Sequence, residues 1–71
     1  MYALTDLELA DRQIAEAMRR TARLRGEIAN GELEGRDVTC AVSLLDAFVV
    51  ALKSLVQHRQ HILIDLGAGR S

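Results

Sequence analysis

Apolar residues recur every three or four positions along two long stretches of this chain, on either side of a segment that contains two glycines. The first series is Leu7, Ala10, Ile14, Ala17, Thr21, Leu24 and Ile28, with Thr21 as its polar member, and the second is Val38, Ala41, Leu45, Phe48, Leu52 and Leu55. This spacing keeps one side of a helix turned toward a neighbouring helix. Because the connection is short, we expect antiparallel neighbours. The pattern predicts an all-α fold, a two-helix antiparallel hairpin.

Capping residues place the ends of the first helix. Thr5 and Glu8 have the spacing of a capping box, in which each side chain accepts a hydrogen bond from the other residue's amide. Asn30 followed by Gly31 is typical of a helix end, because glycine adopts the left-handed backbone at little cost. We therefore expect the first helix over about residues 5–30.

The second helix is expected to follow a turn over residues 31–37. Asp37 is a suitable N-cap, since its carboxylate can accept hydrogen bonds from the first amides of the helix. The helix is then expected over about residues 38–66, and the glycines at positions 67 and 69 are expected to end it. Residues 67–71 would form a frayed tail, and residues 1–71 a single helical-hairpin domain.

The second helix is apolar over most of its circumference. Beside its core series it carries Val42, Val49, Val56 and Leu63 at seven-residue spacing, and Cys40, Leu44, Ala47 and Ala51 on another flank. Its polar residues form one narrow stripe, interrupted by Val50, of Thr39, Ser43, Asp46, Lys53, Gln57 and Gln60. One partner helix cannot cover all of this apolar surface. The sequence therefore predicts that the hairpin dimerises into a four-helix bundle, or that another helical protein covers the surface.

Seven apolar residues in the middle of this helix are the predicted protein interface. They are Leu44, Leu45, Phe48, Val49, Leu52, Leu55 and Val56. With such an interface the protein would be a self-associating or partner-binding module whose specific role the sequence does not state.

The length of the second apolar stretch raises the question of a membrane span. Residues 38–56 approach the length that crosses a bilayer. However, Asp46 lies near the middle and Lys53 follows, and a charge at each position is costly in hydrocarbon. The chain has a net charge of −1, one cysteine and no basic segment at its start. We therefore expect a cytoplasmic protein with no membrane partner.

The arginines of the first helix offer an alternative function. Arg12, Arg19 and Arg23 share one outer face of the helix, with Arg20 beside them, and such a face can follow a phosphate backbone. The five arginines of this helix are balanced by five acids, which lie mainly toward its start and so complement the helix dipole. The alternative function is therefore binding of RNA or DNA by a hairpin dimer through this face.

Residues that carry chemistry are few. His58, His61 and Asp65 are three and four residues apart near the end of the second helix, a spacing at which imidazole and carboxylate groups can bind zinc. The alternative is a solvated helix end. Cys40 is expected to be a small buried core residue. No nucleophile, phosphate-binding loop or paired-cysteine motif accompanies these groups, so the sequence predicts no enzyme, no cofactor and no small-molecule substrate.

Two segments resemble small proteobacterial proteins with a helical-hairpin pattern. They are Ala10–Glu16 with Arg23–Ala29, and Ala41–Phe48 with His58–Leu63 and Leu66–Gly67. The resemblance spans residues 10–67 and implies a helical hairpin and no activity. The chain departs from the pattern at Thr21, and at Val49 and Val50, where the pattern is more polar. The hairpin dimer Rop, which binds RNA on a helix face, is similar in architecture only.

Overall fold

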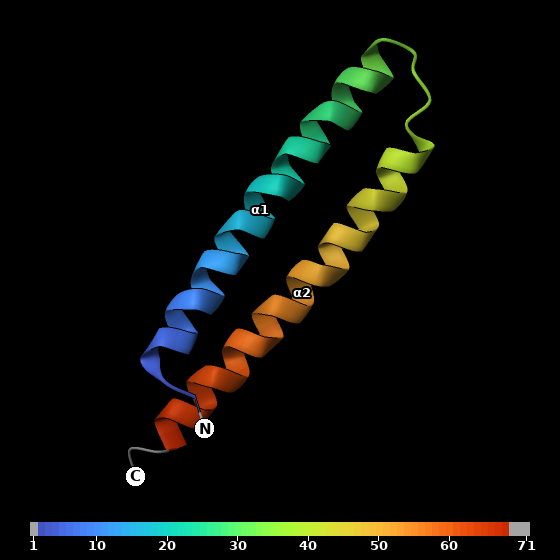
Figure 1. The fold of residues 1–71 in the computed structure, drawn as a ribbon. Helices are drawn as coiled ribbons and strands as arrows, with labels where there is room; N and C mark the ends of the chain where they lie inside the picture. The colour runs from blue at the N-terminus through green and yellow to red at the C-terminus, as the bar shows by residue number, and fades with distance from the viewer. Residues whose placement is uncertain (1, 69–71) are drawn as a thin grey trace.

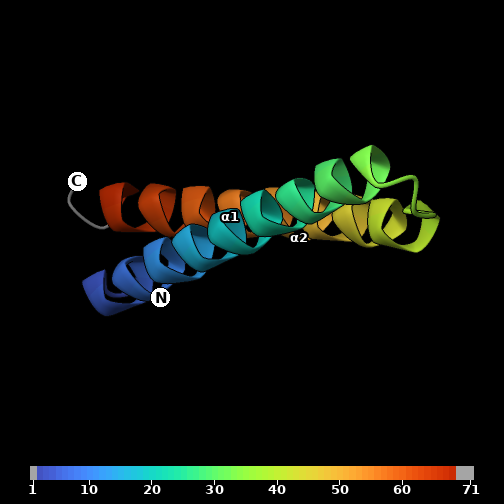
Figure 2. The ribbon, with the colours of Figure 1, turned by 90° about the horizontal axis from the view of Figure 1, so that it is seen from above.

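The computed structural model describes residues 2–68, which form two long helices joined by a short turn (Figure 1). Helix α1 spans Leu4–Leu33 and helix α2 spans Thr39–Ala68, with 30 residues in each. The helices run antiparallel and pack along their length, and the view from above shows that they cross at a shallow angle (Figure 2). The all-α antiparallel hairpin predicted from the sequence is confirmed.

Helix α1 begins one residue earlier than expected and uses another cap. Ala3 is the N-cap residue, and the Asp6 carboxylate accepts a hydrogen bond from the Ala3 amide at 2.7 Å. Thr5 and Glu8, the residues expected to form the capping box, both lie inside the helix. The Asp6 charge also lies in the first turn, where the helix dipole favours an anion.

The end of α1 differs more from the expectation. The helix continues through Gly31 to Leu33, and the left-handed residue is Gly35, with φ of 73°. The Arg36 amide donates to the Gly31 carbonyl at 2.8 Å, and the Gly35 amide donates to the Glu32 carbonyl at 3.1 Å. These two bonds form a Schellman motif. The expected end at Asn30 and Gly31 was wrong because Gly35 supplies this motif one turn later.

Gly31 instead lets the two helices approach each other at the turn. It is buried, and a Cβ atom at this position would lie 2.7 Å from Cγ1 of Val38. The turn therefore closes tightly because residue 31 has no side chain.

Helix α2 starts close to its expected position and continues past its expected end. Asp37 accepts hydrogen bonds from the Thr39 amide at 2.9 Å and the Thr39 hydroxyl at 2.6 Å. Both bonds lower the pKa of Asp37 below its usual value, and the bond from the Thr39 hydroxyl has the larger effect. Gly67 and Ala68, both expected in the tail, are helical, and residues 69–71 lie outside the described residues.

The core is one thin layer between the helices. Its buried apolar residues are Ala10, Leu24, Ile28 and Ile62. Thr21 is buried among them, and its hydroxyl donates to the Ala17 carbonyl at 2.8 Å, which satisfies it within the helix. Small residues at positions 10 and 31 of α1 allow α2 to pack closely against it.

Polar contacts join the open end of the hairpin. The Tyr2 amide donates to Asp65 at 2.9 Å, and the Tyr2 ring lies edge-on to the His58 ring at 5.6 Å between centroids. Arg59 forms an ion pair with Asp11. Tyr2 and Asp11 are thus held against the last turns of α2.

Candidate interaction surface

The two helices bury very different shares of their residues. Helix α1 buries five residues, namely Ala10, Thr21, Leu24, Ile28 and Gly31. Among the side chains of α2 that the structure describes, only Ile62 is buried. The more apolar helix is therefore the less covered one.

The exposed apolar residues of α2 lie along its whole length. Their exposed fractions are 40% for Val42, 47% for Leu44, 67% for Val50, 49% for Val56 and 60% for Ile64. Val50 and Ile64 lie within the otherwise polar side that faces away from α1. Val42 and Val56 lie on one flank, and Leu44 lies on the other.

The seven residues predicted as an interface divide into two groups. Leu45, Phe48, Val49, Leu52 and Leu55 are half-buried in the hairpin, whereas Leu44 and Val56 are exposed. The first group is used at least in part for contact with α1. The prediction omitted Val42, Val50 and Ile64, which are also exposed on α2. For Val50 the signal was present, because it interrupts the polar stripe.

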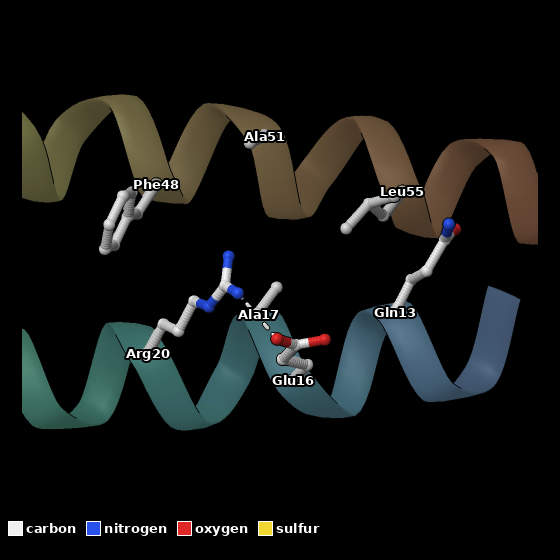
Figure 3. A pocket seen from close by; sticks show the side chains of 7 residues that line it. All are labelled: Gln13, Glu16, Ala17, Arg20, Phe48, Ala51 and Leu55. Carbon is white, nitrogen blue, oxygen red and sulfur yellow. Dashed lines mark hydrogen bonds and ion pairs between the residues drawn. The ribbon is translucent and has the colours of Figure 1, made fainter. Parts of the chain in front are cut away.

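One flank of the hairpin is hollowed into an open groove of about 340 Å³ (Figure 3). Its α2 wall is apolar and consists of Phe48, Ala51 and Leu55. Its α1 wall consists of Gln13, Glu16, Ala17 and Arg20. The Arg20 guanidinium and the Glu16 carboxylate form an ion pair at 2.6 Å on this wall. The groove therefore offers an apolar strip beside a polar rim and holds no converging set of reactive groups.

The four arginines proposed to contact nucleic acid are all exposed on α1. Arg20 pairs with Glu16 at the edge of the groove, so part of its charge is neutralised locally. Arg12, Arg19 and Arg23 take part in no ion pair among residues 2–68 and lie on the side of α1 away from α2. The structure thus keeps these three on one outer face.

The three residues considered as metal ligands have other partners or remain apart. Asp65 accepts the Tyr2 amide, and the His58 ring packs against the Tyr2 ring. His61 is exposed. Within residues 2–68 no group of three or more His, Cys, Asp or Glu side chains is placed to hold a metal ion. The predicted hairpin brings its two ends together, but the spacing of these three residues did not indicate that Tyr2 would contact two of them.

Cys40 does not lie in the core. It is exposed near the start of α2 as a free thiol. The expected burial was wrong because Cys40 lies on a flank of α2 that α1 does not reach, while the half-buried Ala41 lies nearer to α1.

Helix α2 is long and apolar enough, by length and composition alone, to cross a membrane over Thr39–Gly67. None of the 18 residues in its most apolar window is buried in the hairpin. The same window contains the charged residues Asp46 and Lys53.

Comparison with known proteins adds no relative: no family model, no curated protein and no solved structure matches this chain. The likeness to small proteobacterial hairpin proteins therefore stays a prediction from the sequence. The architecture itself is shown by the packing of α1 against α2.

Proposed function

We propose that this protein is a non-enzymatic interaction module of the cytoplasm that acts through the uncovered apolar faces of α2. The observation that carries the proposal is the exposure of Val42, Val50 and Val56 on a helix with one buried residue among those described. Each large apolar side chain left in water forgoes roughly 1.5–3 kcal/mol of burial. A partner helix, from a second copy or from another helical protein, would recover this free energy. In the simplest assembly two hairpins form a four-helix bundle.

The test is the mass in solution, measured by light scattering coupled to size exclusion. We expect the purified chain to exceed its monomer mass of 7.8 kDa. We expect the double variant Val42→Glu, Val56→Glu to reduce that mass to the monomer's while helical content by circular dichroism is retained. Charged groups at these positions would otherwise be buried unpaired. Leu33→Glu, at a residue 86% exposed near the turn, is the matched control and should leave the mass unchanged.

Two outcomes would contradict the proposal. One is a monomer that captures no helical partner, and the other is a variant whose assembly is unaffected. A chain that floats with neutral lipid vesicles, and no longer does so after Val42→Glu, Val56→Glu, would show that lipid rather than protein covers α2.

A second candidate function is nucleic-acid binding by the outer face of α1. The observation that favours it is that Arg12, Arg19 and Arg23 are exposed together without ion-pair partners among residues 2–68. A gel-shift titration with duplex RNA and DNA tests it. Binding that weakens steeply with salt and is lost in Arg19→Glu, Arg23→Glu would support it, and no binding at low salt would exclude it.

A further inference from the structure

The hairpin exposes more surface than a compact protein of its mass. The chain exposes 5496 Å² at 7.8 kDa, whereas a folded monomer of that mass exposes about 4,400 Å². The excess of about 1,100 Å² is similar to the roughly 800 Å² that each partner buries in a standard interface. One further protein surface of ordinary size would therefore cover it.

Two charged residues in the middle of α2 indicate which protein provides that surface. Asp46 and Lys53 are both exposed, and neither takes part in an ion pair among residues 2–68. They lie seven residues apart, so they share one side of α2 but are separated by about 10 Å along its axis. That distance is too long for an ion pair within one chain.

We propose that the occupant is a second copy of this chain, with its α2 antiparallel to the first and in a register set by Asp46 and Lys53. This inference rests on the proposed function and names its partner. A two-fold axis perpendicular to α2, between Val49 and Val50, places residue 46 of each copy opposite residue 53 of the other. Each dimer then contains two Asp46–Lys53 pairs, as in antiparallel coiled coils.

The apolar residues fit the same axis. Val42 and Val56 exchange places across it to within one residue, or about 1.5 Å along the helix. Val49 of each copy lies beside the axis, opposite Val50 of the other copy. The polar ends Thr39 and Gln60 are also equidistant from the axis. A parallel pair in register would instead place Asp46 against Asp46 and Lys53 against Lys53, which like-charge repulsion disfavours.

Charge reversal tests the register. We expect Asp46→Lys alone and Lys53→Asp alone each to raise the dimer Kd about tenfold or more, because each variant places like charges together at both pairs. The double variant Asp46→Lys, Lys53→Asp should recover the wild-type Kd. An equimolar mixture of the two single variants should form a heterodimer with both pairs restored. Glu8→Lys, an equal change of charge on α1, is the control and should leave the Kd unchanged.

The exposed Cys40 tests the orientation. In the antiparallel pair the two Cys40 residues lie about 28 Å apart along the axis, so mild oxidation should produce no disulfide dimer. Val50→Cys in a Cys40→Ala background should cross-link readily. A fast Cys40–Cys40 cross-link would overturn the antiparallel arrangement.

The outcomes separate the two proposals. A wild-type chain that is monomeric at all concentrations removes self-association and this inference with it. A wild-type dimer whose Kd is unchanged by charge reversal overturns only the register and leaves the interaction module in place.

Discussion

Helices α1 and α2 have equal length and pack against each other, yet only α1 behaves as a surface helix. It buries one stripe of five residues and turns its arginines outward. Helix α2 carries the larger apolar residues and buries only Ile62 among the side chains described. This difference indicates that one neighbouring helix covers the apolar stripe of α1, whereas α2 has the composition of a helix with several neighbours.

The shape of the molecule supports this distinction. Its radius of gyration is 16.4 Å, compared with about 11 Å for a compact domain of this length. Two helices packed side by side bury only the residues that lie between them. The apolar flanks of α2 therefore remain open on both sides of the hairpin.

The largest difference in stability is expected between substitutions of a buried and of an exposed residue of α2. We expect Ile62→Ala, at a residue 0% exposed, to lower the free energy of unfolding by about 2–5 kcal/mol. Val50→Ala, at a residue 67% exposed, should change it by less than about 0.5 kcal/mol in the monomer. Urea titrations followed by circular dichroism at low protein concentration provide the measurement. Equal effects at the two positions would show that the hairpin seam is not as observed.

Two glycines of α1 should respond in opposite ways to the same substitution. Gly31→Ala should destabilise by about 1 kcal/mol, because overpacking against Val38 exceeds the gain in helix propensity. Gly26→Ala has no atom within 4 Å of the new Cβ and should stabilise by about 0.5–1 kcal/mol. Thermal unfolding checks both. Adding Val38→Ala should remove the destabilisation caused by Gly31→Ala. If Gly31→Ala instead stabilises the protein, the Val38 side chain moves freely.

The sequence predicted the architecture well because helical periodicity is a local property. Apolar spacing correctly predicted two helices and the buried residues Ala10, Leu24 and Ile28. The ends of α1 were predicted less well, since Thr5 and Gly31 carry local signals that Asp6 and Gly35 also carry. The local sequence does not show which of them acts.

The candidate surface was predicted only in part because its burial is not local. Spacing placed Phe48 in the core series and Val50 in the polar stripe, but it did not show that α1 leaves Val56 exposed while Val49 is half-buried. The contacts of Tyr2 with His58 and Asp65 join residues more than fifty positions apart, and no periodicity indicates them. Such contacts become visible only when the turn fixes the register of the two helices.

The Asp11–Arg59 ion pair tests whether the far end of α2 is held to α1 by charge. Both side chains are substantially exposed, at 52% and 37%, so we expect a coupling of about 0.2–1 kcal/mol. A double-mutant cycle of Asp11→Asn and Arg59→Gln, read by urea unfolding, measures it. The coupling should fall with added salt, and a salt-independent value would show that the contact is not electrostatic.

The smallest effect is expected at the start of α2, where Asp37 caps Thr39. Hydrogen bonds from the Thr39 hydroxyl and amide lower the pKa of Asp37 in the folded state. A depressed carboxyl pKa contributes stability above the unfolded value of 3.8, and that contribution is lost as pH falls through the lower folded pKa. The Tm difference between the wild type and Asp37→Ala should therefore be largest near neutral pH and shrink in acid. Asp37→Asn keeps an acceptor without a titrating charge, so its Tm difference from Asp37→Ala should stay constant with pH. If the Tm difference between the wild type and Asp37→Ala is also constant with pH, the charge of Asp37 contributes nothing to the cap.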